Sequence, residues 1–341
     1  MRPLTCPACG ARVFFDNLDC PCGAAVAYLP DADVFALLGD GDGAADGPAE
    51  GAAPAAPCAN REAASCNWAA DAPGALCRSC AMTVVFPDLS VGENRALWVR
   101  TEAAKRRVLR GLGRWGWFTL ADPGPRPEFH MLSEDTASGE TRVMMGHLSG
   151  AITINVTEAD PAERVARREA FDEPYRTVAG HFRHEIGHFL FERLAAEPGF
   201  SDAFRALFGD ERADYGEALA AHHANGAPPD WAARHVSAYA SAHPHEDWAE
   251  SFAHVLHLWA ILGGFVGEGL SAPCLPHPDY DPYAAEDGAE VIQAAGELCI
   301  SLNAINRAMG IGDLYPFVLS ETAREKLVFA HSWLRAGPGA G

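Results

Sequence analysis

The clustering of cysteines near the start of the chain is the feature that most restricts its fold. Eight of the ten cysteines lie within the first 80 residues: Cys6, Cys9, Cys20, Cys22, Cys58, Cys66, Cys77 and Cys80. A Cys-x-x-Cys turn brings two sulfurs to one tetrahedral ion, and two such pairs complete a structural zinc site. The spacing therefore predicts two structural zinc sites, one formed by the first four of these cysteines and one by the last four.

Metal binding would also explain how this segment folds, because it holds few residues for a core of its own. In a reducing compartment such clustering indicates metal ligands rather than disulfides. Interleaved quartets of the same eight cysteines and an iron–sulfur centre are the alternatives. Cys274 and Cys299 stand alone in the sequence and are expected to be buried as small apolar side chains.

Composition and periodicity divide the rest of the chain. Residues 38–57, rich in Gly, Ala, Pro and Asp, predict a flexible insert. We expect a zinc-ribbon head over 1–92, a larger domain over 93–335 and a disordered tail over 336–341. Apolar periodicity predicts strands at Glu128–Leu132, Arg142–Leu148 and Ala151–Thr157, and helices near 93–113, 161–170, 174–197, 244–264, 289–309 and 321–334. The larger domain is therefore α+β, with a small antiparallel or mixed sheet and a mostly helical C-terminal part.

The segment HFRHEIGHFLFERL contains the pattern His-Glu-x-x-His at residues 184–188. Positions i and i+4 of a helix share a face, so His184 and His188 can direct imidazole nitrogens at one zinc ion. Glu185 would lie beside the metal, where it can take a proton from metal-bound water as a general base. Gly187 leaves room beside the metal. His181, one turn earlier, is interpreted as a structural histidine rather than a further ligand.

A catalytic zinc needs a third protein ligand and one open position. Glu246 and Glu250 stand four residues apart on the helix predicted from Pro244, so both carboxylates face the same way among apolar neighbours. We expect Glu246 to bind zinc and Glu250 to hold a ligand histidine through its second ring nitrogen. The alternatives are Glu250 as the ligand, or one of His243, His245 and His254.

The order Tyr239, Glu246, Glu250 resembles the third-ligand helix of gluzincins of the anthrax lethal factor type. In that group the first Glu binds zinc and the Tyr stabilises the oxyanion. The resemblance implies that Tyr239 donates a hydrogen bond to the tetrahedral intermediate, with a merely packed aromatic as the alternative. The strand AITINVT fits a zincin, which pairs an extended substrate with an edge strand beside the metal, and it fits an ordinary core strand as well.

Several stretches together resemble the bacterial zinc-binding metallopeptidases that carry an N-terminal zinc-ribbon region. They are CPACGARVFFDN, CNWAA with LCRSC, EAAKRR, EPYRTVAGHFRHEIGHF, ALFGDERADYGEAL, YASAHPHEDWAESFAHVLH and NRAMGIGDLYPFVLS. They cover most of residues 1–335, and the insert at 38–57 has no expected counterpart. The resemblance implies a zincin-like catalytic domain behind a structural zinc head. The His-Glu-x-x-His motif and the cysteine spacing add the expected count of one catalytic and two structural Zn²⁺ ions.

The net charge of −20 disfavours nucleic acid as a partner, because neutralising phosphates needs a positive face. The chain has no run of 18 apolar residues and no apolar stretch before its first cysteines. Neither a membrane span nor a signal peptide is therefore expected, and the cytoplasm is the predicted location. Residues 95–114 hold seven basic side chains against one acidic one. They are interpreted as a solvated helix face, with a docking surface for an acidic protein as the alternative.

These patterns predict a zinc-dependent hydrolase that acts as a peptidase on a peptide or protein substrate. Two other functions stay open. One is a recruitment module, in which the zinc ribbon and the basic helix bind a partner and the hydrolase-like core is a scaffold. The other is hydrolysis of a non-peptide amide or ester at the same metal. The acidic residues Asp210, Glu211 and Asp214 are expected in a solvated loop or helix end, with a second ion site as the alternative.

Overall fold

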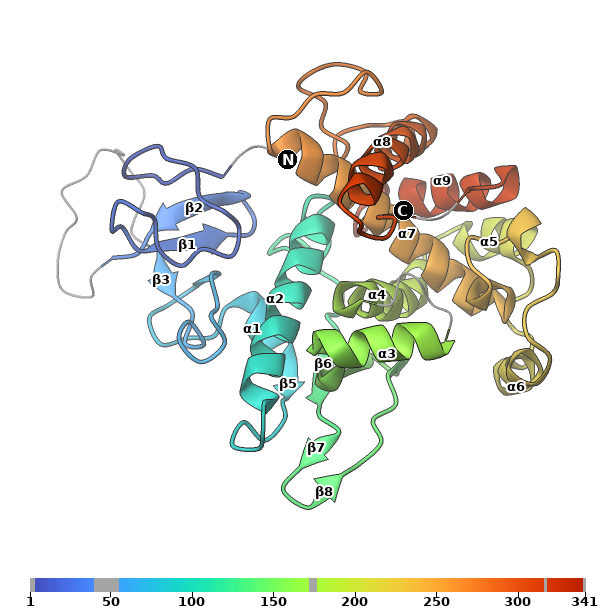
Figure 1. Cartoon of the computed structure of the whole chain (residues 1–341), viewed down its shortest axis with the longest axis horizontal. Helices are drawn as coiled ribbons and strands as arrows, with labels where there is room; N and C mark the ends of the chain where they lie inside the picture. The colour runs from blue at the N-terminus through green and yellow to red at the C-terminus, as the bar shows by residue number, and fades with distance from the viewer. Residues whose placement is uncertain (1–3, 40–54, 172–176, 316–317, 340–341) are drawn as a thin grey trace. The chain divides into compact units, whose positions relative to one another are not determined.

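The computed structural model describes residues 4–39, 55–171, 177–315 and 318–339. The chain forms two compact units: an N-terminal unit of Arg2–Ala170 with Thr177–Ala179, and a C-terminal unit that contains Gly180–Gly341 (Figure 1). The domain boundary between 92 and 93 stays a prediction. Most of the insert, residues 40–54, and the last two residues of the tail lie outside the described residues, and so do the predictions made for them.

Short paired strands form the cysteine-rich head of the N-terminal unit. Strand β1 (Val26–Leu29) pairs antiparallel with β2 (Val34–Leu37), and β3 (Ala56–Pro57) pairs antiparallel with β4 (Ala69–Ala70). Helix α1 (Arg78–Ala81) follows, with Cys77 as its N-cap. Leu38 and Ala55 form a bridge, so the described ends of the insert lie side by side. Elements this short are typical of a segment that metal sites hold together.

A mixed sheet follows the head, with strand order β5-β6-β10-β9. Strands β5 and β10 run parallel to β6, and β9 runs antiparallel to β10 at the edge. The strand AITINVT is β10, an inner strand, so the edge-strand interpretation is wrong and the antiparallel edge belongs to β9. The bounds are β5 (Thr83–Val85), β6 (Glu128–Leu132), β9 (Gly146–Leu148) and β10 (Ala151–Asn155), with a hairpin of β7 (Asp135–Thr136) and β8 (Gly139–Glu140) between them.

Helix α2 (Asn94–Gly113) carries the basic segment, and the head supplies its counter-charges. Arg107 pairs with Asp16. Asp33 receives two arginines: Arg110 Nε lies 2.8 Å from Asp33 Oδ1, and Arg114 Nη1 lies 3.0 Å from Asp33 Oδ2. The solvated-face interpretation is wrong for Arg110 and Arg114, whose side chains are only 10% and 21% exposed. It holds for Arg107, whose side chain is 57% exposed.

Lys105 and Arg106 depart further from a solvated face, since they are 0% and 2% exposed. Lys105 Nζ lies 3.1 Å from Glu102 Oε2 and donates to Ser79 O at 2.8 Å. Arg106 Nη2 donates to Ser65 O at 3.0 Å, directly before a cysteine of the head. A buried cation costs several kcal/mol unless such partners surround it. This side of α2 is therefore buried against the head through polar contacts.

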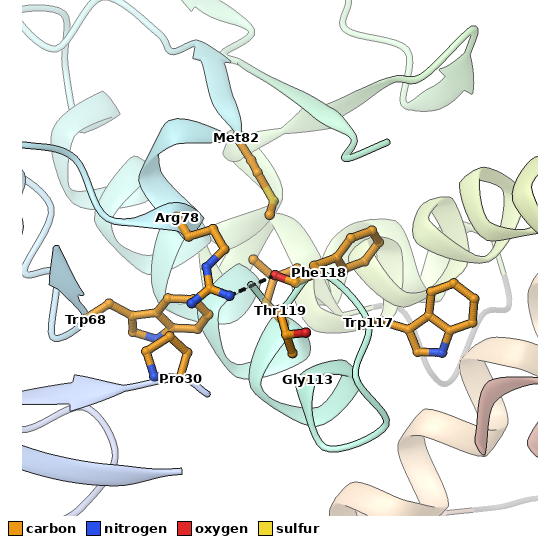
Figure 2. A pocket seen from close by; sticks show the side chains of 9 residues that line it. Pro30, Trp68, Arg78, Met82, Gly113, Trp117, Phe118 and Thr119 are labelled. Atoms are coloured by element: carbon orange, nitrogen blue, oxygen red, sulfur yellow. Dashed lines mark hydrogen bonds between the residues drawn. The ribbon is translucent and has the colours of Figure 1, made fainter. Parts of the chain in front are cut away.

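A small cavity lies within the N-terminal unit beside Arg78 (Figure 2). Arg78 Nη1 donates to Asp31 Oδ1 at 2.9 Å and to Phe118 O at 3.4 Å. The volume of the cavity, about 10 Å³, suits one water molecule and excludes an organic ligand. The lining side chains, among them Trp68 and Leu109, therefore serve packing between the head and α2.

The C-terminal unit is helical. Helix α7 is long and apolar enough to span a membrane by length and composition, but 67% of its apolar stretch is buried within the protein. It packs against α8 and α9, as expected of a core helix. The sequence prediction missed α5 and α6. Helix α4 (Val178–Leu194) has its first two residues in the N-terminal unit and the rest in this one. The other bounds are α5 (Phe200–Phe208), α6 (Tyr215–Asn225), α7 (Pro244–Gly267), α8 (Gly288–Ala308) and α9 (Glu321–Ala336), with 3-10 turns η2 (Trp231–Ala233) and η3 (Tyr239–Ser241). The 3-10 turn η1 (Val156–Ala159) and helix α3 (Pro161–Phe171) precede α4 in the chain.

Candidate metal centre

Helices α4 and α7 bring three predicted ligands together. His184 Nε2 lies 3.1 Å from His188 Nε2 and 3.0 Å from Glu246 Oε2. His188 Nε2 lies 3.5 Å from Glu246 Oε1. One ligand atom from each of the three residues lies within 4.8 Å of the others. The i, i+4 pair of one helix and the first turn of another therefore converge on a single point.

The hydrogen bonds around His184 fix which of its nitrogens faces that point. His184 Nδ1 lies 2.8 Å from Glu250 Oε1, and Glu250 Oε2 accepts a hydrogen bond from the Ser237 hydroxyl at 2.6 Å. An ionised carboxylate only accepts, so His184 Nδ1 carries the proton in this bond. In the neutral ring, Nε2 then directs a lone pair at the Glu246 carboxylate. Lone pairs and a carboxylate that converge at about 3 Å repel unless a cation lies between them.

The carboxylates of the centre favour a positive charge at this point, which either a proton on His184 or a metal ion in its place supplies. Burial opposes ionisation of Glu246, which is 1% exposed, but the imidazoles of His184 and His188 hold its pKa well below the usual range. Burial also acts to lower the pKa of His184, and the carboxylates of Glu246 and Glu250 outweigh it and raise that pKa. Two imidazoles and one carboxylate form a donor set that zinc accepts in catalytic sites. The residues present therefore fit the predicted ion.

Glu185 lies on the same turn of α4 as the two histidines. It is 7% exposed, and its Oε2 atom is buried without a hydrogen-bond partner in the described part of the chain. An unsatisfied buried polar atom costs about 1–3 kcal/mol, and more when it is charged. Such an atom therefore needs an explanation, and proximity to a metal site provides one.

Tyr239 and the alternative ligands occupy other positions. The Tyr239 ring lies 6.1 Å from the His184 ring, centroid to centroid. His243 caps α7 by accepting from the backbone of His245 at 3.1 Å. His254 Nδ1 lies 2.5 Å from the Tyr315 hydroxyl, away from the three converging ligands. Glu250 lies on the Nδ1 side of His184 rather than at the point of convergence.

Tyr215 is a contact that the sequence analysis missed. Its hydroxyl donates to Glu246 Oε1 at 2.5 Å, from the first residue of α6. The sequence held one signal for this helix, because Asp214 is a favourable N-cap and its side chain accepts from Glu217 N at 2.8 Å. No local pattern indicates that the hydroxyl would reach α7, which lies about thirty residues further along the chain.

The acidic residues between α5 and α6 have local partners. Asp210 Oδ1 lies 2.7 Å from Arg212 Nε, and Glu211 Oε2 accepts from Arg205 Nε at 3.0 Å. Asp214 is the N-cap of α6. These contacts match the predicted loop and helix end, and the three residues do not gather with other ligands among the described residues.

Gly187 allows α4 and α7 to approach closely. A Cβ atom there would lie 3.1 Å from Phe252 Cδ1 and 3.2 Å from Ala249 Cα. Trp248 Nε1 donates to the Gly187 carbonyl at 2.8 Å, which ties the two helices at the same level. The glycine therefore serves helix packing, which differs from the expected role of leaving room beside the metal.

We expect Gly187→Ala to destabilise the protein by about 1–3 kcal/mol, because the methyl group would force apart two helices in contact. Urea unfolding of the zinc-loaded protein measures this loss. Gly264→Ala on α7 is the matched control, since a Cβ there meets no atom within 4 Å and alanine favours the helix. Equal stability of the two variants would contradict the packing explanation.

The eight clustered cysteines form two tetrads, in the order of the sequence. The first holds Cys6, Cys9, Cys20 and Cys22, and the second holds Cys58, Cys66, Cys77 and Cys80. In the first, Cys9 Sγ lies 3.6 Å from Cys20 Sγ. In the second, Cys66 Sγ lies 3.6 Å from the sulfurs of both Cys77 and Cys80. The second tetrad is buried throughout, whereas Cys9 and Cys22 of the first are exposed.

Two models of known families match the chain. A family model described as "Putative zinc-binding metallo-peptidase" matches residues 94–333, and a zinc-ribbon domain model matches residues 3–91. The chain belongs to this metallopeptidase family. The α+β fold, the mostly helical C-terminal part and the cysteine-rich head agree with the fold predicted for a family member.

Relatives of this metallopeptidase-family chain occur in mycobacteria. Uncharacterized proteins of Mycobacterium tuberculosis (strain ATCC 25618 / H37Rv) and Mycobacterium bovis (strain ATCC BAA-935 / AF2122/97) are 37% identical to it over 341 residues. The alignments cover 97% of this chain and 95% of each relative. No solved structure matches the chain.

Proposed function

We propose that the chain is a zinc-dependent peptidase in which His184, His188 and Glu246 hold the zinc and Glu185 is the general base. The convergence of the three ligand atoms carries this proposal. A bound zinc ion supplies Lewis acidity, which polarises a substrate carbonyl and makes water nucleophilic near neutral pH. The family supports peptide or protein as the substrate class.

The chain's own residues then have distinct tasks. The unpartnered oxygen of Glu185 can accept the proton of the attacking water and later return it to the leaving amine. Glu250, itself held by Ser237, fixes the tautomer and ring orientation of His184. The implied role of Tyr239, donation to the oxyanion, stays a prediction.

The two cysteine tetrads complete the proposal as structural zinc sites, so a fully loaded chain would hold three zinc ions. Each tetrad provides four sulfur ligands and leaves no open position, as structural sites do. The buried second tetrad would stabilise the junction with α2, where Arg106 lies against the neighbouring carbonyls.

We expect purified wild-type protein to contain three zinc ions per chain and His188→Ala to contain two, with loss of peptide cleavage. The change removes one of three ligands and leaves the tetrads intact. Elemental analysis of protein treated to remove loosely bound metal gives the count. His223→Ala on the exposed α6 is the matched histidine control and should keep three. Two zinc ions in the wild type, or three in His188→Ala, would contradict the assignment.

The substrate class needs a separate assay. Wild-type protein is incubated in parallel with a mixed peptide library and with a panel of non-peptide amides and esters. Cleavage of peptides that His188→Ala lacks supports the peptidase. Turnover confined to the second panel would replace it with the other hydrolase class, and zinc binding without either activity would favour the recruitment module.

A further inference from the structure

Helix α6 contacts the metal centre through one face. None of its residues is fully buried, and its half-buried residues all lie within two turns after Tyr215: Ala218, Leu219 and His222. These positions follow Tyr215 by three, four and seven residues, so they share its side of the helix. At the far end of this face the His222 ring packs edge-on against Tyr239, 6.0 Å between centroids.

The start of α6 is held in place by hydrogen bonds that do not involve the tyrosine. The Asp214 side chain caps the helix. His243 Nδ1 accepts from a backbone amide, so its Nε2 is the donor to Ala213 O at 3.1 Å. The Tyr215 ring packs edge-on against the His243 ring at 5.2 Å. The backbone and the ring of Tyr215 are therefore held by contacts that do not involve Glu246.

The two oxygens of Glu246 consequently have different surroundings. Oε1 accepts the Tyr215 hydroxyl at 2.5 Å. Oε2 is buried, has no hydrogen-bond partner in the described part of the chain, and lies 3.0 Å from His184 Nε2. Oε1 thus accepts a proton donor while it lies 3.5 Å from His188 Nε2, and Oε2 is left without a donor of its own beside His184.

We propose that Tyr215 is a positioning residue of the metal site, which holds Oε1 of the Glu246 carboxylate so that Oε2 faces His184 Nε2. The inference rests on the proposed function, because it concerns the same zinc ion. Without this bond the carboxylate can rotate, and rotation would offer either oxygen or both to the metal. Outer-shell partners of this kind typically change metal affinity by about 10- to 100-fold.

The test compares Tyr215→Phe with Tyr239→Phe. Phenylalanine keeps the ring that packs on His243, so circular dichroism of the zinc-loaded variants should match that of the wild type. Competition with a zinc chelator then gives the affinity of the catalytic site. We expect Tyr215→Phe to weaken zinc binding by about 10- to 100-fold and Tyr239→Phe to leave it unchanged. Unchanged affinity in Tyr215→Phe would overturn the proposal.

A double-mutant cycle with Glu246→Ala tests whether the effect passes through the carboxylate. With Glu246 removed, Tyr215→Phe should cause no further loss of the residual binding by the two histidines. A loss as large as in the wild-type background would overturn the proposal, because the hydroxyl would then act by another route. A wild-type protein with two zinc ions would instead refute the proposed function, and the two failures are therefore distinguishable.

Discussion

Glu185→Gln is expected to lower kcat/KM for peptide cleavage by about 10²–10⁴-fold while the protein keeps all three zinc ions. Glutamine has the shape of glutamate but cannot accept a proton from water at neutral pH. Because Glu185 is not among the converging ligands, its replacement leaves the donor set intact. Rates of peptide hydrolysis and the zinc content of the same preparation measure the two parts of this prediction.

Glu192→Gln is the matched control, since it makes the same chemical change on an exposed position of α4. It should cleave peptides at the wild-type rate. Turnover by Glu185→Gln near that of the wild type would remove the proposed general base. Loss of one zinc ion from Glu185→Gln would show instead that this carboxylate helps to hold the metal.

The double variant Cys77→Ser, Cys80→Ser is expected to lose one zinc ion and the fold of the cysteine-rich head. Structural zinc in small domains contributes about 10–16 kcal/mol of apparent binding free energy, which is as large as the whole stability of a typical domain. Cys77 also caps α1, so its loss affects the element that bears Ser79, a partner of buried Lys105. Limited proteolysis and circular dichroism would detect the unfolding.

Cys299→Ala serves as the control for the cysteine variants. Cys299 is 3% exposed on α8 and belongs to neither tetrad. Its replacement removes one buried sulfur and should cost only about 1 kcal/mol, without loss of zinc. A double variant that resists proteolysis as well as Cys299→Ala does would show that the head folds without its second metal site.

Features encoded by local periodicity were predictable from the sequence. Strand β6 and helices α2, α7, α8 and α9 lie within a few residues of their predicted bounds, because each shows a regular apolar pattern or a clear terminal signal such as Pro244. The convergence of His184, His188 and Glu246 was predictable as well, because two short spacings placed donors on common helix faces. The order of the cysteine tetrads followed from the pairing of near neighbours.

Features that depend on distant partners were not predictable. Lys105 and Arg106 can be buried only because carbonyls of the head accept their hydrogen bonds. A run of basic residues in the sequence does not by itself distinguish such a buried contact from a solvated helix face. Strand β10 has an alternating pattern that suits an edge or an inner strand, and its pairing with both β6 and β9 decides between them. Tyr215 was missed because no residue of α6 is fully buried, and because the Tyr215 hydroxyl bonds to a residue far away in the sequence.

The contacts between the head and α2 limit whether the zinc-ribbon head can be replaced by that of another protein. Two arginines share Asp33, a lysine reaches the carbonyl of Ser79, and an arginine reaches the carbonyl of Ser65. A zinc ribbon from another protein, placed before α2, would bring its own cysteines and metal but not these acceptors. Lys105 and Arg106 would then be buried without hydrogen-bond partners from the head. The head and α2 therefore have to be transferred together if this part of the chain is moved into another protein.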